Sequence, residues 1–107
     1  MPSKKQIDLL FKSIRLKIKK EGLQILVSPQ MLPQAQLLIV TSRRIGNAPT
    51  RNLIKRRIKA IYHEQKIAQA QLDLIFITHP VITTIPFARL SHLIQEAIQE
   101  AHKRLLT

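Results

Sequence analysis

The sequence contains no cysteine, which excludes disulfide bonds and thiolate metal sites and is compatible with a cytosolic protein. It also lacks long hydrophobic runs. The apolar stretches at residues 37–40 and 74–77 are far too short to span a bilayer. Near the N-terminus, Lys12 and Arg15 interrupt the apolar residues, a pattern unlike that of a signal peptide. We therefore expect a cytoplasmic protein with no membrane partner.

Acidic residues are scarce as well. Six Asp and Glu residues stand against eighteen Lys and Arg residues, which gives a formal net charge of +12. Such an excess indicates a polyanionic partner and favours nucleic acid over an anionic membrane surface. The chain has 107 residues, of which 45% are hydrophobic. This length and composition predict one folded domain over residues 1–107 and argue against disorder.

Hydrophobic periodicity divides the chain into helices and strands. The predicted helices cover residues 4–20, residues 51–69 and a segment that begins near Pro86. The predicted strands cover residues 23–27, 37–41 and 72–78. Residues 81–84 form either a loop or a short edge strand. This order predicts an α+β domain in which helices pack on a central sheet.

Local signals mark the ends of these helices. Gly22 is expected to end the first helix, because glycine often follows the last helical residue. Thr50 is expected to cap the second helix through its hydroxyl oxygen. Proline suits the first turn of a helix, which places Pro86 at the start of the third.

Basic residues concentrate in one segment. Residues 43–59 hold seven of the eighteen Lys and Arg residues, and no acidic residue occurs between Glu21 and Glu64. Like charges in such a segment repel one another, and a bound polyanion would offset the repulsion. Gly46 places a turn within the segment, and a helical pattern follows from Arg51. The segment predicts a shaped cationic surface, with a merely solvated basic face as the alternative.

The predicted second helix has two distinct arcs, because an α-helix turns by about 100° per residue. Ile54, Ile58 and Ile61 fall on an apolar arc that would pack on the sheet. The cationic arc consists of Arg51, Asn52, Lys55, Arg56 and Lys59. The pair Arg51–Asn52 lies in the first turn, where free backbone N–H groups and the positive end of the helix dipole favour phosphate.

An ordered motif covers this region. It reads Ser-Arg-Arg at 42–44, then Gly46 and Ala48, then Arg-Asn-Leu-Ile-Lys-Arg at 51–56. The motif resembles the signature of the bacterial ribonuclease P protein family, which is Ser-Lys-Lys, Gly, Ala and then Arg-Asn-Arg-x-Lys-Arg. The leading helix, the strand that begins near Asp73 and the closing helix resemble the family too. Leu53 departs from the motif, since the family usually has arginine there.

The resemblance implies a compact α/β sandwich. It implies a central sheet of about four strands, three helices and a left-handed βαβ crossover that contains the basic helix. Connections between parallel strands of one sheet are almost always right-handed, so this crossover would be an exception.

The resemblance also implies the protein subunit of ribonuclease P, which assists the removal of the 5′ leader from precursor tRNA. Its partners would be the catalytic RNA and precursor tRNA, with no obligate protein partner. The chemistry and the bound Mg²⁺ would belong to the RNA. The protein itself would then hold no catalytic residue, no metal and no cofactor.

The resemblance assigns residues to two surfaces. The residues that would bind the catalytic RNA are Ser42, Arg43, Arg44, Asn47, Arg51, Asn52, Lys55, Arg56 and Lys59. The residues that would line a cleft for the leader, between the sheet and the leading helix, are Phe11, Ile7, Ile14 and Ile25. Core packing is an equal interpretation of Phe11, which falls on the apolar side of a predicted helix.

The remaining chemistry-bearing residues do not indicate an active site. The four histidines lack metal-ligand spacing. Glu96 and Glu100 are expected to form surface ion pairs with basic residues that follow them. Tyr62 is expected to pack with its hydroxyl in contact with water.

Three other functions remain open at this point. The first is a ribosomal RNA-binding protein with no link to tRNA processing, which the composition permits equally. The second is a self-sufficient nuclease, which would need carboxylates or histidines gathered at one site. The third is a membrane-surface protein, although so small a domain needs its apolar stripe for the core.

Overall fold

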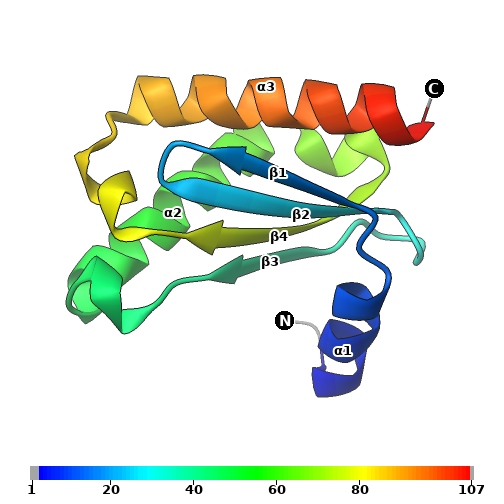
Figure 1. Cartoon of the computed structure of the whole chain (residues 1–107), viewed down its shortest axis with the longest axis horizontal. Helices are drawn as coiled ribbons and strands as arrows, with labels where there is room; N and C mark the ends of the chain where they lie inside the picture. The colour runs from blue at the N-terminus through cyan, green and yellow to red at the C-terminus, as the bar shows by residue number, and fades with distance from the viewer. Residues whose placement is uncertain (1–2, 107) are drawn as a thin grey trace.

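The computed structural model describes residues 3–106, which form three α-helices and a four-stranded sheet (Figure 1). The helices are α1 (Lys4–Lys12), α2 (Ala48–Glu64) and α3 (Phe87–Leu106). The strands are β1 (Leu16–Lys20), β2 (Leu23–Pro29), β3 (Leu37–Val40) and β4 (Leu72–Thr78). Short 3-10 helices are η1 (Arg43–Ile45), η2 (Ile67–Ala70) and η3 (Pro80–Thr84). The predicted α+β class is confirmed.

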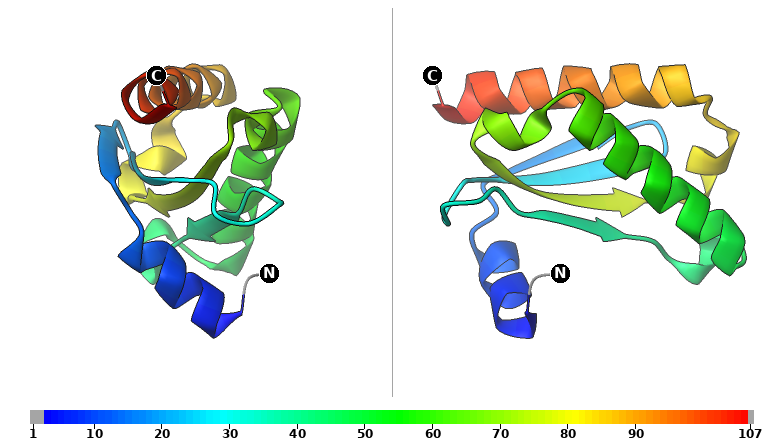
Figure 2. Two further views of the ribbon diagram at one scale, coloured as in Figure 1. Left: turned by 90° about the vertical axis from the view of Figure 1, so that its right-hand side faces the viewer. Right: turned by 180° about the vertical axis from the view of Figure 1, so that it is seen from behind.

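The sheet has the order β1-β2-β4-β3, in which β3 and β4 are parallel and the other neighbouring pairs are antiparallel. The parallel pair is joined through α2. In the right-hand view of Figure 2, α2 lies in front of the sheet, β3 and β4 both point to the right, and β4 lies above β3. The chain therefore crosses to the left when the strands point upward. This is the left-handed crossover that the family resemblance implies, and it is rare among βαβ units.

The prediction of one helix over residues 4–20 is wrong, because the segment forms α1 and then β1. α1 ends at Lys12, and Ser13 caps it by donating its backbone N–H to the carbonyls of Leu9 and Leu10. From Leu16 onward, inward side chains alternate with exposed lysines, the period of a strand. Antiparallel pairing with β2 therefore makes this segment a strand and not the second half of a helix.

Gly22 lies in the turn between β1 and β2 and ends no helix. Its φ of 69° is left-handed, and a Cβ built there would lie 2.8 Å from the backbone nitrogen of Ile82. Glycine is therefore required both by the turn and by the close approach of η3.

The second helix begins earlier and ends earlier than predicted, at Ala48 and Glu64. Asn47 caps it in place of Thr50, because its side-chain oxygen accepts from the backbone N–H of Thr50 at 3.0 Å. Beyond the helix, Lys66 has a left-handed φ of 54°, and the chain continues as η2. Residues 81–84, predicted as loop or edge strand, belong to η3.

The two faces of the sheet are covered unequally. α2 and α3 cover one face and enclose the main core, which includes Ile25, Phe76, Ile58 and Ile94. On the other face, Leu10 of α1 packs with Leu26 and Ile75 in a much smaller cluster. The left-hand view of Figure 2 shows α1 and α2 on opposite sides of the sheet. The α1 face is thus only partly covered.

Candidate nucleic-acid interface

The turn before α2 is built to present cations. Ile45 is buried and anchors η1, while Arg43 and Arg44 beside it are exposed. Gly46 follows with a φ of 147°, a backbone conformation that suits glycine alone, and Asn47 then caps α2. Hydrogen bonding at this cap includes the Thr50 hydroxyl, which donates to Asn47 Oδ1 at 2.8 Å. These contacts join the turn to the first residues of α2.

The helix α2 separates its two arcs as the sequence predicts. Ile54, Ile58 and Ile61 are buried against the sheet. Asn52, Arg56 and Lys59 are exposed, while Arg51 and Lys55 are half-buried. Arg51 is also oriented by its guanidinium, which donates from Nη1 to the carbonyl of Gly46 at 3.4 Å. We use "cationic surface" below for Ser42, Arg43, Arg44, Asn47, Arg51, Asn52, Lys55, Arg56 and Lys59.

The charges of the cationic surface are not neutralised within residues 3–106. The ion pairs there join Lys20 and His92 to Glu96, Arg89 to Glu21, and Arg104 to Glu100. None of them reaches residues 43–59, so the mutual repulsion of these cations stays uncompensated. Both carboxylates form surface ion pairs as predicted, but only Glu100 pairs with a basic residue that follows it, since the partners of Glu96 precede it. Leu53, at the departing motif position, is 38% exposed beside the cations.

The predicted leader cleft maps to the opposite, α1 face of the sheet, with one exception. Phe11 is 45% exposed and lies outside the core, and Ile7 and Ile14 are half-buried. Ile25 is 0% exposed and packs in the core under α2 and α3, so its assignment to the cleft is wrong. Side chains alternate along a strand, which turns the neighbouring Leu26 toward α1 instead.

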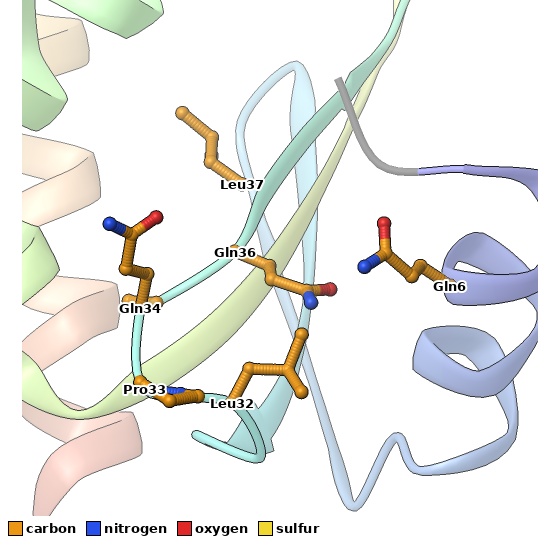
Figure 3. A pocket seen from close by; sticks show the side chains of 7 residues that line it. Gln6, Leu32, Pro33, Gln34, Gln36 and Leu37 are labelled. Carbon is orange, nitrogen blue, oxygen red and sulfur yellow. The ribbon is translucent and has the colours of Figure 1, made fainter.

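A groove that the sequence did not reveal lies between α1 and the loop of residues 30–36. It has a volume of about 360 Å³, and its lining residues are Gln6, Leu9, Lys12, Ser13, Met31, Leu32 and Gln36. A hollow of about 560 Å³ adjoins it along residues 32–37 (Figure 3). The sequence signal that could have indicated it is the apolar pair Met31 and Leu32 between two prolines, both of which are exposed in the structure.

A buried carboxylate holds the loop of this groove. Asp73 is 0% exposed and accepts hydrogen bonds from the backbone N–H groups of Met31 at 3.2 Å and Gln36 at 2.9 Å. The same carboxylate acts on Tyr62. Burial and then the charge of Asp73 raise the pKa of the Tyr62 phenol above its ordinary value. The Tyr62 hydroxyl is buried with no hydrogen-bond partner within residues 3–106, so the expected contact with water is wrong.

Within the described residues, no cluster of His, Asp and Glu has the arrangement to hold a metal ion. No helix among them is long and apolar enough to cross a membrane.

The fold and the cationic surface together define a small, basic α+β protein with an exposed cationic helix face. The sequence model of the Ribonuclease P family matches residues 2–102, and the chain therefore belongs to this family. Membership in the family carries an association with ribonuclease P, with tRNA processing and with an RNA partner. Among curated protein sequences, none matches the chain significantly.

Solved structures show the same fold. The RNase P protein from Thermotoga maritima superposes with a TM-score of 0.78 at 19% identity, covering 94% of each chain. The Staphylococcus aureus RNase P protein superposes with a TM-score of 0.79 at 18% identity, covering 94% of this chain and 93% of that one. A second Thermotoga maritima structure, in complex with 1-(4-fluorophenyl)-2-thiourea, gives a TM-score of 0.72 at 20% identity and covers 86% of this chain and 90% of that one.

Proposed function

We propose that this chain binds the catalytic RNA of ribonuclease P through its cationic surface and the 5′ leader of precursor tRNA through its α1 face. It thereby assists Mg²⁺-dependent removal of the leader by the RNA. The protein contributes no catalytic residue and holds no metal of its own. A cytoplasmic location is part of this proposal. The observation that carries it is the uncompensated cationic surface in a chain of the Ribonuclease P family.

The cationic surface suits a structured RNA for two physical reasons. Each phosphate that a Lys or Arg neutralises releases condensed counterions, which drives binding without any base contact. In addition, the N-terminus of α2 places the positive end of its dipole beside these cations. Pro49 has no N–H, and the N–H groups of Thr50 and Arg51 donate to Asn47, which leaves the N–H of Ala48 in the first turn for a phosphate.

The α1 face suits a single strand of RNA. Phe11 is exposed there, and unpaired bases stack on aromatic side chains in many single-strand sites. α1 and α2 lie on opposite sides of the sheet, so the leader and the catalytic RNA would contact different surfaces (Figure 2). The protein can then hold both RNAs at once.

The decisive experiment mixes the purified protein with a bacterial ribonuclease P RNA and precursor tRNA at low Mg²⁺. We expect leader removal to be stimulated strongly, since the protein supplies cations that Mg²⁺ otherwise provides. A ribosomal RNA-binding protein of similar charge is the control and should not stimulate cleavage. Lack of stimulation by this chain would refute the proposal, and cleavage by the protein alone would show a nuclease instead.

A further inference from the structure

The groove between α1 and the loop of residues 30–36 lies on the side of α1 away from Phe11. Leu9 and Ser13 line the groove, and each is about 160° around the helix from Phe11 at roughly 100° per residue. Leu10, fully buried on the sheet, separates the two sides. The groove is therefore a different place from the cleft in which Phe11 would stack on the leader.

One wall of the groove is fixed before any ligand arrives. Asp73 accepts from both Met31 and Gln36, near the two ends of the loop. Two backbone hydrogen bonds strengthen the attachment, from Gln30 N–H to the Gln71 carbonyl at 2.9 Å and from Leu74 N–H to the Gln36 carbonyl at 3.0 Å. A preformed wall lowers the entropic cost of binding a ligand.

Two amide side chains face one another across the groove between α1 and the loop. Figure 3 shows Gln6 of α1 and Gln36 of the loop pointing toward each other. Gln6 Oε1 accepts from the backbone N–H of Ser3 at 2.8 Å, which leaves Gln6 Nε2 as the donor. Gln36 Oε1 is buried and accepts no hydrogen bond within residues 3–106. The terminal torsion of glutamine is soft, so a donor that enters the groove can take up this acceptor at small cost.

The other lining residues supply apolar contact and positive charge. Leu9, Met31 and Leu32 are exposed large apolar side chains, the kind that pack against a flat ring. Lys12 lines the groove and also the adjoining pocket that contains Arg15. The groove thus combines an apolar surface, one donor, one acceptor and neighbouring cations.

A nucleotide matches this combination, since its base has an apolar face and a hydrogen-bonding edge and its phosphate is anionic. We propose that the groove binds one unpaired nucleotide of the 5′ leader, with the base held by Gln6, Gln36 and the apolar side chains and the phosphate near Lys12 and Arg15. The inference rests on the proposed function, because that function brings the single strand to α1. It adds a second nucleotide site, on the far side of α1 from Phe11.

Substitution of one amide tests the site. Gln36→Leu keeps the size of the side chain, removes its donor and acceptor, and leaves the backbone bond to Asp73 intact. The matched control is Gln34→Leu in the same loop, where the side chain points away from α1 (Figure 3). With the assembled ribonucleoprotein, Gln36→Leu should bind leader-bearing precursor tRNA about fivefold more weakly, as the loss of one hydrogen bond to a base predicts. Mature tRNA should bind both variants and the unchanged protein equally.

Crosslinking tests the location independently of affinity. The chain has no cysteine, so Leu32→Cys creates a unique thiol for a photoreactive group beside the groove. It should crosslink to leader nucleotides, whereas the same group on Leu53→Cys of α2 should reach the catalytic RNA.

Crosslinks from Leu32→Cys to catalytic RNA alone, or equal weakening of precursor and mature tRNA binding by Gln36→Leu, would overturn the site. Suppose that the unchanged protein stimulates cleavage but the Gln36→Leu variant binds precursor tRNA as tightly as the unchanged protein. That result would refute the nucleotide site and leave the proposed function standing. If the unchanged protein does not stimulate cleavage, the proposed function fails.

Discussion

The cationic surface and the α1 face are built in different ways. The cationic surface comes from one continuous segment, residues 42–59, and is dominated by exposed charges that nothing in the described chain neutralises. The α1 face is assembled from α1, the loop of residues 30–36 and the open side of the sheet, and a buried carboxylate holds the loop in place. The cationic surface is expected to bind RNA with an affinity that depends on salt concentration. The α1 face offers a fixed shape, and a fixed shape can distinguish one RNA strand from another.

The largest expected effect comes from detaching the loop of residues 30–36, which forms one wall of the α1 face. Asp73→Ala removes the acceptor of two backbone N–H groups and should lower the free energy of unfolding by about 3 kcal/mol. Asp8→Ala, on the exposed side of α1, is the matched control and should change it little. Urea titration measures both values. An equally stable Asp73→Ala protein would show that the loop needs no such attachment.

Phe11→Ala should break leader binding while the cationic surface stays intact. Loss of one stacking platform should weaken binding of leader-bearing precursor tRNA by roughly 1–2 kcal/mol. Affinity for the catalytic RNA should not change, because α1, which carries Phe11, lies on the other side of the sheet from α2 (Figure 2). Filter binding of precursor and mature tRNA to the ribonucleoprotein checks this, and equal weakening of both would contradict it.

Lys55→Ala and Arg56→Ala should each weaken binding to the catalytic RNA by roughly 1 kcal/mol and make its salt dependence shallower by about one counterion per lost contact. Arg104→Ala is the control, since Arg104 lies on α3 and pairs with Glu100. The measurement is affinity across a series of salt concentrations. An unchanged slope in both α2 variants would show that α2 is not the RNA-binding face.

The smallest effect concerns Tyr62, which is buried on α2 in the main core. Tyr62→Phe removes a buried hydroxyl without a partner and should leave stability at neutral pH unchanged or raise it by about 1 kcal/mol. Because the raised pKa makes the folded state hold the phenol proton more tightly than the unfolded chain does, stability should fall as the pH rises above about 10. Tyr62→Phe should reduce this alkaline loss. Urea titrations at pH 7 and pH 10.5 measure it, and an identical alkaline loss in the variant would contradict the account.

The sequence revealed the cationic surface because its information is local. The turn and the cap region follow from neighbouring residue types, and the positions of Ile54 and Arg56 follow from their spacing along one helix. Even there, the cap moved from Thr50 to Asn47, since both side chains can accept a hydrogen bond from a helix N–H. The left-handed crossover came from the family resemblance alone, as no local signal specifies handedness.

The α1 face was harder to predict because its information is long-range. Ile25 was assigned to the wrong face, since a strand of apolar residues does not reveal which alternate set turns toward which helix. β1 was missed because Ile14 and Ile18, which are four residues apart, fit both a helical and a strand period. The contacts of Asp73 with Met31 and Gln36 join residues about forty positions apart, and only the pairing of β2, β3 and β4 brings them together.

One measurement tests the division between the two surfaces most directly. Leader removal at low Mg²⁺ is followed while the protein concentration is raised, for the unchanged chain, for Arg51→Ala combined with Arg56→Ala, and for Phe11→Ala. The α2 double variant should recover full activity at high protein concentration, because only assembly with the catalytic RNA is weakened. Phe11→Ala should assemble normally and keep a raised KM for precursor tRNA at every protein concentration. Recovery of Phe11→Ala by added protein, or a raised KM that persists in the α2 variant, would contradict the account.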